Sequence, residues 1–144
     1  MPLPENINFE LVSPEEKLVS ESAYMVVLPG DEGDFAAMPG SASLLSSLKP
    51  GLVTIQWSKE DKEMMKIFIT GGFADVTGAQ CTILAEQAQE ISDIDQAETE
   101  QTIRNLQEDL SLAKDKKEQS RIEENLTIAK AKLQSLTGRA IISL

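Results

Sequence analysis

Three acidic residues near the middle of the N-terminal half could bind a cation. Asp31, Glu32 and Asp34 surround Gly33 in a short segment, and carboxylate oxygens are preferred ligands of hard divalent cations. The spacing does not match the calcium-binding loop of an EF-hand, and neighbouring carboxylates would repel phosphate. We therefore interpret this segment as a solvated turn.

Cys81 and the arginines are the other side chains that could support chemistry. Cys81 lies within an apolar segment, which predicts a buried and unreactive thiol. Arg104, Arg121 and Arg139 could bind an anion, but the acidic residues near them favour exposed ion pairs. None of these patterns is specific for a catalytic or metal-binding site.

The composition excludes several classes of protein. The 144 residues include no His and one Cys, which removes the commonest general base and any site built from several thiolates. The 24 acidic and 13 basic side chains give a formal net charge of -11, which disfavours nucleic acid and anionic membranes as partners. The N-terminus does not have the pattern of a signal peptide, and no run reaches the roughly 18 apolar residues of a transmembrane helix. We expect a soluble cytoplasmic protein.

Residues 1–88 have the pattern of an all-β domain. All the prolines and all the aromatic residues of the protein lie in this part. Short strand-like segments are separated by turn signals and cover residues 6–11, 19–28, 52–57, 65–70, 73–77 and 80–84. The repeated hairpins predict antiparallel pairing in a sandwich or barrel, with Trp57 and the phenylalanines in its core.

Residues 89–144 have the pattern of two helices. Apolar residues recur at spacings of three and four in two stretches, which are Ile103, Leu106, Leu110 and Ala113, and then Ile122, Leu126, Ala129, Leu133 and Leu136. We expect Asp93 to cap the first helix together with Gln96, and Gly138 to end the second. The polar segment 114–120 predicts a turn and an antiparallel hairpin. Because it contains neither Gly nor Pro, one continuous helix is an alternative.

The predicted hairpin has too few large apolar residues to be stable alone. Full burial of a Leu or Ile side chain contributes roughly 1.5–3 kcal/mol, whereas ordering one backbone residue costs about 1–2 kcal/mol. The helices must therefore pack on the β domain, on a partner protein, or on each in turn. Composition alone favours a permanently packed lid over a movable switch.

Residues 28–51, LPGDEGDFAAMPGSASLLSSLKPG, form the most distinctive segment of the sequence. With residues 9–15 before it and residues 71–76 and 83–86 after it, the segment resembles the epsilon subunit of bacterial F-type ATP synthases, which is equivalent to the mitochondrial delta subunit. The resemblance covers essentially the whole sequence. Within the family, residues 28–35 resemble alphaproteobacterial members more than chloroplast members.

This resemblance implies an N-terminal antiparallel β-sandwich, residues 1–88, and a C-terminal α-helical hairpin, residues 89–144. It implies a non-catalytic central-stalk subunit of a proton-translocating synthase, which binds the gamma subunit and the c-ring and couples rotation to ATP synthesis. The C-terminal helices would contact the alpha and beta subunits and inhibit ATP hydrolysis. The protein would lie peripherally at the cytoplasmic face of the bacterial inner membrane, without inserting into it. The sequence does not distinguish proton from sodium coupling.

Two departures from the family pattern concern possible sites. Residues 40–43 read Gly-Ser-Ala-Ser, where family members commonly have Gly-His-Ala-Pro. The ATP-binding motif of some bacterial members, Ile/Leu-Asp-x-x-Arg-Ala, is matched only by Ile94 and Asp95, because Glu98 and Thr99 replace its Arg and Ala. A carboxylate in place of a guanidinium would oppose a triphosphate. We therefore expect no nucleotide, no other cofactor and no metal.

Two other functions stay open on the residues alone. A β-domain adaptor or chaperone-like protein with a coiled-coil arm would self-associate through the apolar stripes of its helices. An enzyme would need a pair of carboxylates in a pocket, and Asp31 and Asp34 are the candidates.

Overall fold

The computed structural model describes residues 5–138, and the protein forms two compact units that divide between Glu90 and Ile91. The sequence predicted this division after residue 88. The first unit, called the β unit below, extends further because strand β10 (Ala88–Glu90) pairs with β7 (Met65–Ile69). Arg139 lies outside the described residues.

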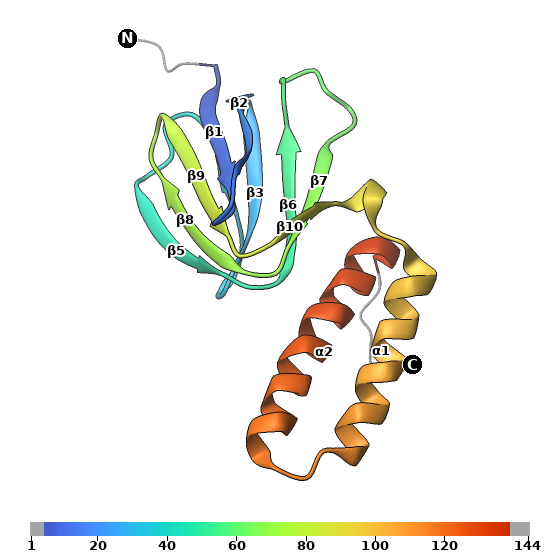
Figure 1. Ribbon diagram of the computed structural model, residues 1–144. Helices are drawn as coiled ribbons and strands as arrows, with labels where there is room; N and C mark the ends of the chain where they lie inside the picture. Colours follow the sequence, from blue (N-terminus) through green and yellow to red (C-terminus); the bar gives the residue numbers. More distant parts are fainter. Residues whose placement is uncertain (1–4, 139–144) are drawn as a thin grey trace. The chain divides into compact units, whose positions relative to one another are not determined.

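The β unit is a curled sheet whose two sides enclose a core (Figure 1). Its other strands are β1 (Ile7–Val12), β2 (Lys17–Ala23), β3 (Met25–Gly30), β4 (Gly33–Ala37), β5 (Leu44–Leu48), β6 (Gly51–Gln56), β8 (Gly72–Val76) and β9 (Gln80–Ala85). Hydrogen-bonded neighbours follow the order β10-β7-β6-β3-β5-β8-β9-β1-β2, and β4 pairs with β3. The β10-β7-β6-β3 side faces the β5-β8-β9-β1-β2 side, which confirms the predicted β-sandwich.

Alternate side chains of the strands fill this core. Phe9, Leu28, Ile55 and Ile83 are at most 1% exposed and come from both sides of the sandwich. Trp57 is partly buried, and its ring meets the Phe9 ring edge to face with the centroids 6.3 Å apart. Because a fully buried large apolar side chain contributes roughly 1.5–3 kcal/mol, the core is the main source of stability of the β unit.

The segment 19–28 was predicted as one strand, and this prediction is wrong. The backbone changes partner at Tyr24, so that Ala23 still pairs with β1 whereas Met25 pairs with Gln56 of β6. The N–H of Tyr24 donates to the carbonyl of Gln56 at 2.9 Å. A run of strand-forming residues does not show where a strand leaves one neighbour for another.

Strands β4, β5 and β10 were not predicted. β4 and β5 lie in the segment 28–51, whose Pro and Gly residues indicated turns. Pro29 is itself part of β3. It lies beyond Val27, the last residue of β3 that pairs with β6, so the missing N–H of Pro29 does not interrupt that ladder.

β1 and β9 pair in parallel, with Asn8 opposite Gln80 and Val12 opposite Leu84. The sequence predicted antiparallel pairs only, because hairpins between successive strands are visible in it. β1 and β9 are instead joined by most of the β unit, which is a long enough connection for parallel pairing.

A corner at Gly71 and Gly72 carries the backbone from one side of the sandwich to the other. Their φ angles are 134° and 151°, and a Cβ atom on Gly72 would overlap the carbonyl oxygen of Leu84. Only glycine fits such a position. The β8–β9 and β7–β10 ladders keep the same register on either side of the corner. Together they form one long antiparallel ladder that bends at the glycines.

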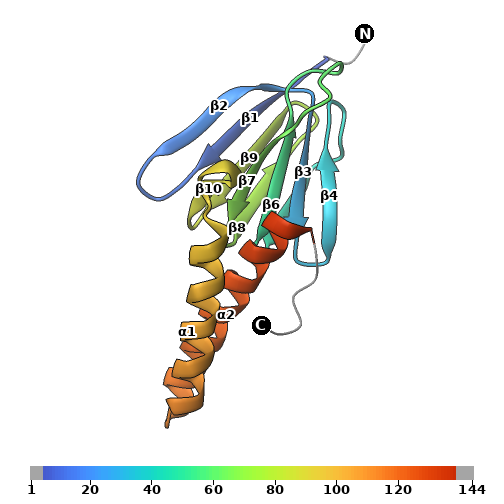
Figure 2. The same cartoon turned by 90° about the vertical axis from the view of Figure 1, so that its right-hand side faces the viewer.

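The second unit, called the helical unit below, is a hairpin of α1 (Gln96–Leu112) and α2 (Lys116–Thr137), which run side by side (Figure 2). A 3-10 turn, η1 (Ile91–Asp93), precedes them. The buried side chains between the helices are Ile103, Leu126, Ala129 and Leu133, and Leu106 and Leu110 are partly buried against them. These contacts confirm the hairpin and exclude one continuous helix. The apolar stripes of the two helices therefore pack against each other within one molecule. In the alternative of an adaptor protein, these stripes were expected to mediate self-association.

The first helix begins two residues later than predicted. The N–H of Ile94 donates to the carbonyl of Ile91 at 3.2 Å and closes the 3-10 turn. Asp93 therefore lies within that turn and is not the cap. Asp95 is the N-cap, and its Oδ1 accepts the N–H of Glu98 at 3.0 Å.

The turn between the helices needs no glycine because side chains satisfy its backbone groups. Asp115 caps α2 and accepts the N–H of Glu118 at 2.7 Å. Gln119 Nε2 donates to the carbonyl of Ala113 at 3.2 Å, at the end of α1. Gly138 ends α2 with a φ of 72°, as predicted.

Candidate interaction surfaces

Asp31 and Glu32 form the turn between β3 and β4 and project into solvent. We call this turn the acidic turn. Gly33 has a φ of 133°, and the N–H of Asp31 donates to the carbonyl of Ser47 at 3.1 Å. Within the described residues, no group of three or more His, Cys, Asp or Glu side chains could hold a metal ion. Asp31 and Glu32 therefore give the turn negative charge without converging on a cation.

A shallow hollow of about 500 Å³ lies between the acidic turn and β5. Its lining includes Asp31, Glu32, Asp34, Phe35, Leu44 and Leu45. Leu44 and Leu45 are 45% and 75% exposed, respectively. Carboxylates beside exposed leucines suit a partner segment that is apolar and carries positive charge.

Large apolar side chains also project from the outer surface of β5, β8 and β9. Phe73 lies opposite Leu84 in the β8–β9 ladder, and these side chains are 58% and 56% exposed. Leu45 pairs with Asp75, two residues along β8 from Phe73, so it is the diagonal neighbour of Phe73. We call Leu45, Phe73 and Leu84 the apolar face. Exposed apolar groups that gather in this way are typical of protein–protein contact sites.

Phe73 corrects the prediction that the phenylalanines lie in the core. In β8 the inward side chains are Ala74 and Val76, and Phe73 alternates with Asp75 on the outside. Both faces of this strand contain an apolar residue, so the alternation alone did not identify the inner one. The adjacent leucines of β5 and the outward Leu84 were missed for the same reason.

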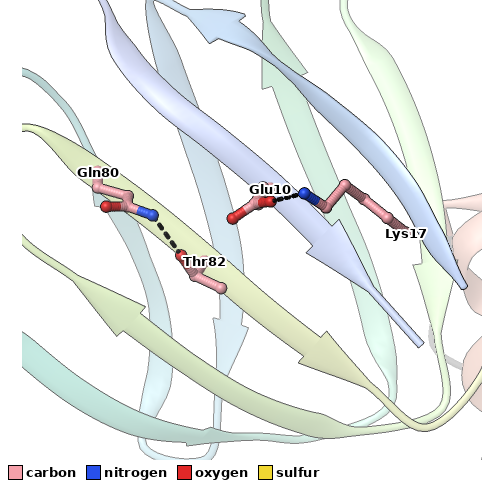
Figure 3. A network of polar contacts seen from close by, with 4 residues as sticks. All are labelled: Glu10, Lys17, Gln80 and Thr82. Carbon is pink, nitrogen blue, oxygen red and sulfur yellow. Dashed lines mark hydrogen bonds and ion pairs between the residues drawn. The ribbon is translucent and has the colours of Figure 1, made fainter. Parts of the chain in front are cut away.

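A polar row borders the apolar face, and Figure 3 shows four of its members, Glu10, Lys17, Gln80 and Thr82. Asp75 pairs with Thr82 on β9, and Thr82 pairs with Glu10 on β1. Gln80 Nε2 donates to Thr82 Oγ1 at 3.1 Å, and Lys17 Nζ forms an ion pair with Glu10 Oε1 at 2.5 Å. An apolar centre with a polar border is the usual composition of a protein interface.

Cys81 is fully buried in β9 and faces the core, as predicted. Burial, and secondarily the nearby charge of Asp75, raises the pKa of this thiol from 9.0 to about 12. Because the thiolate is the reactive form, Cys81 is not suited to act as a nucleophile at neutral pH.

The partial ATP motif lies where η1 meets α1. Asp95 is occupied as the helix cap, and its carbonyl accepts the Thr99 hydroxyl at 2.8 Å. Glu98 adds a second carboxylate in the first turn of α1. A helix N-terminus can bind phosphate, but here the N–H of Glu98 donates to the Asp95 carboxylate and the N–H of Thr99 donates to the Asp95 carbonyl. Ile94 is half-buried and contributes the N–H that closes η1.

A groove lies at the turn end of the hairpin. It is a shallow groove of about 360 Å³, lined by Leu106, Asp109, Leu112, Glu118, Arg121, Ile122 and Asn125. Leu112 is 70% exposed, and Lys114, Lys116 and Lys117 lie nearby in the sequence. Arg104, the other arginine of the described hairpin, donates through Nη2 to Gln101 Oε1 at 3.1 Å.

Both units match known protein families. Residues 6–91 match the family described as ATP synthase, Delta/Epsilon chain, beta-sandwich domain. Residues 95–142 match the family of the C-terminal domain of the ATP synthase epsilon chain. Within the described part of the protein, no helix combines the length and the apolar character that a membrane crossing requires.

Relatives and solved structures agree with these matches. The protein is 36% identical over 138 residues to the ATP synthase epsilon chain of Rhodospirillum centenum, an alignment that spans 94% of either protein. It is 42% identical over 123 residues to that of Mesorhizobium japonicum, an alignment that spans 85% of this protein and 90% of the relative. One subunit in the cryo-EM structure of the Euglena gracilis mitochondrial ATP synthase has the same fold, with a TM-score of 0.80, 21% identity, and coverage of 91% of this protein and 81% of that subunit. The protein therefore belongs to the ATP synthase epsilon chain family, the non-catalytic central-stalk components that serve ATP synthesis and proton transport in F-type ATP synthases.

Proposed function

We propose that this protein couples rotation to ATP synthesis by holding two rotor partners with its β unit, and restrains ATP hydrolysis with its helical unit. The β unit, up to Glu90, would bind the gamma subunit and the c-ring. The helical unit, from Ile91, would contact the alpha and beta subunits. The protein would lie peripherally at the cytoplasmic face of a bacterial inner membrane. The observation that carries the proposal is the apolar face on a unit that belongs to this family.

Two surfaces of the β unit support the binding of two partners. The apolar face presents Phe73 and Leu84 side by side, and burying large exposed apolar groups is a main source of affinity at protein interfaces. The acidic turn and its hollow lie next to this face and share Leu45 with it. One partner would cover the apolar face while the other meets the carboxylates.

The helical unit suits a regulatory role because few contacts hold it together. Within residues 91–138, the buried cluster consists of Ile103, Leu126, Ala129 and Leu133. Lys114 and its neighbours give the turn of the hairpin positive charges on a protein whose net charge is -11. An acidic surface on a partner would attract this end of the hairpin.

The proposal includes no nucleotide, cofactor or metal in the activity of this protein. Ile94 and Asp95 match only part of the ATP motif. The Asp95 carboxylate accepts the N–H of Glu98, and the Glu98 carboxylate stands where the motif has a cation. Two carboxylates at this position would repel a triphosphate.

Reconstitution with purified alpha, beta and gamma subunits tests the proposal. We expect Phe73→Asp to weaken the affinity for gamma by at least about tenfold, because it places a charge in the centre of the contact. Its unfolding midpoint should stay near that of the wild type, since Phe73 is 58% exposed. Leu112→Asp, which changes a similarly exposed apolar residue of the hairpin, is the matched control. Unchanged binding of gamma by Phe73→Asp would contradict the proposal.

The same reconstitution tests the regulatory role. A truncated protein that ends at Glu90 keeps every strand of the β unit. We expect it to bind gamma like the full-length protein and to give faster ATP hydrolysis. Equal hydrolysis rates with the two forms would show that the helical unit does not inhibit.

A further inference from the structure

The sandwich is open along one margin. β4 ends one side of the sandwich and β5 ends the other (Figures 1 and 2). β3 joins the two sides only at the pair of Gly30 with Leu48. The hollow of about 500 Å³ lies at this margin, between residues of β4 and residues of β5.

The backbone of Leu45 faces this opening. The N–H of Asp31 donates to the carbonyl of Ser47 at 3.1 Å, and the N–H of Lys49 donates to the carbonyl of Pro29 at 2.9 Å. Ser47 and Lys49 thus direct their backbone groups to the edge of β5 that β3 meets. Because alternate residues of a strand share an edge and β5 pairs with β8 without a register shift, Leu45 uses this edge too. Among residues 5–138, no strand pairs with the N–H and C=O groups of Leu45 there.

The side chain of Leu44 occupies a core position that is left uncovered. Leu44 pairs with Val76, which is 2% exposed, and it lies on the same face of β5 as Leu48, which is 5% exposed. Leu44 is nevertheless 45% exposed. Phe35, from the β4 side of the hollow, is only partly buried against the core. A segment lying in the hollow would cover both side chains.

The free edge of β5 lacks the features that commonly protect such an edge. β2, at the other end of the same side, contains the charged residues Lys17 and Glu21, and its pairing with β1 has a register shift at Leu11 and Val12. β5 reads Leu-Leu-Ser-Ser-Leu, with no charge, no proline and no register shift against β8. Charges and bulges keep other strands from an edge, whereas an unprotected edge accepts an added strand.

We propose that the free edge of β5 binds an extended segment of the gamma subunit as an additional strand. The inference rests on the proposed function, in which gamma binds the apolar face, because Leu45 belongs both to that face and to the hollow. The backbone of the segment would pair with Leu45, and its inward side chains would cover Leu44 and Phe35. Since the acidic turn lines the hollow, the segment would contain no Asp or Glu.

Ser20 is the matched position on the protected edge of β2. It is exposed and pairs with Glu10 of β1. The N–H of Asn8, two residues before Glu10, donates to the carbonyl of Ala79 at 2.9 Å. Asn8 and Glu10 therefore direct their backbone groups toward β9, so the pair of Glu10 with Ser20 is not hydrogen-bonded. The N–H of Ser20 points away from β1, as the N–H of Leu45 points away from β8.

Amide hydrogen exchange tests for the added strand directly. Exchange proceeds in complexes of the full-length protein with gamma or with the c-ring, and the protein is then released and its amides are read by NMR. We expect the Leu45 amide to exchange at least about tenfold more slowly in the gamma complex than in the free protein, because it gains a backbone acceptor. The Ser20 amide should not change. Equal exchange of Leu45 in the free and gamma-bound protein, or slower exchange with the c-ring alone, would overturn the inference.

Two substitutions of Leu45 separate its backbone from its side chain. Leu45→Pro removes the N–H that faces the opening and keeps the pairing of β5 with β8, whereas Leu45→Ala removes the side chain and keeps the N–H. We expect Leu45→Pro to bind gamma at least about tenfold more weakly than Leu45→Ala does. Ser20→Pro, a proline on the protected edge, should change the affinity less than about twofold. Equal affinities of the two Leu45 variants would contradict the added strand.

The fold of the variants and the proposed function are checked separately. The fluorescence of Trp57 during urea unfolding shows whether Leu45→Pro is folded, and the exchange of the wild-type Leu45 amide tests the strand without any variant. If gamma binds and Phe73→Asp weakens its binding while the Leu45 amide stays unprotected, the proposed function stands and the added strand fails. If gamma does not bind, both fail.

Discussion

The β unit and the helical unit bury their apolar side chains in different ways. The core of the β unit draws side chains from strands far apart in the sequence, and pairs such as β1 with β9 close it. The helical unit buries one narrow seam between two consecutive helices, and local caps such as Asp95 and Asp115 complete it. The difference separates a rigid platform from a part whose folded state needs few contacts to form or to lose.

The two units also differ in what they expose. The apolar face of the β unit lies on paired strands, so its shape is held by backbone hydrogen bonds. In the helical unit, the exposed Leu112 is the last residue of α1 and is followed by a turn. A preorganised surface loses less entropy when it binds, so we expect the β unit to hold a permanent partner and the helical unit an exchangeable one.

The largest effect on this comparison is expected from Phe9→Ala. Phe9 is 1% exposed in the core of the β unit, and removing a buried Phe side chain costs about 3–5 kcal/mol. Urea unfolding followed by the fluorescence of Trp57, the one Trp of the protein, measures the loss. The control Phe73→Ala should cost less than about 1 kcal/mol, since surface changes are usually small. Similar losses for both variants would contradict the assignment of Phe73 to the outside.

A smaller effect, confined to the helical unit, is expected from Ile103→Ala. Ile103 is fully buried in the seam between the helices. Truncation of a buried Ile to Ala costs about 2–5 kcal/mol of stability, and we expect a loss near the lower end of this range. Circular dichroism at the helical minimum should show earlier thermal unfolding, while the Trp57 signal keeps its midpoint. Leu112→Ala, at an exposed position, is the control. A joint shift of both signals would show that the two units unfold as one.

The smallest effect is the one that ionisation of the Cys81 thiol has on the stability of the β unit. We expect none at neutral pH and a growing loss of stability at alkaline pH. The folded β unit holds the pKa of this thiol at about 12 instead of 9.0. Below pH 9 the thiol is protonated in both states and contributes no pH dependence. As the pH rises from 9 toward 12, only the unfolded state loses the proton, so stability falls. The urea midpoint should therefore fall more between pH 8 and pH 10 for the wild type than for Cys81→Ala. An equal fall of the midpoint in both proteins would indicate that Cys81 is in contact with water.

Much of this organisation follows from local sequence signals. The spacing of Ile103, Leu126 and Leu133 predicted helices that pack on each other, because a helix repeats its face every three to four residues. The position of Gly138 predicted the end of α2, since a helix often stops at a residue with positive φ. The apolar run around Cys81 predicted a buried strand.

Other features depend on contacts that no local pattern encodes. The parallel pairing of β1 with β9 and the change of partner at Tyr24 are decided by which strands meet in three dimensions. The outward position of Phe73 depends on the register of β8 within the sheet, because a shift of one residue exchanges the two faces. Asp95 and not Asp93 caps α1, because a 3-10 turn precedes the helix. The apolar face was therefore outside the reach of sequence patterns.

The parallel pairing of β1 with β9 has a consequence for the folding of this protein during its synthesis on the ribosome. β1 is synthesised before the other strands of the β unit. Its free edge can pair with β9 only after β9, which ends at Ala85, has been synthesised. Until then the nascent polypeptide exposes the apolar sides of Phe9 and Leu11. Closure of the platform thus comes late in translation, and the two helices emerge only after it.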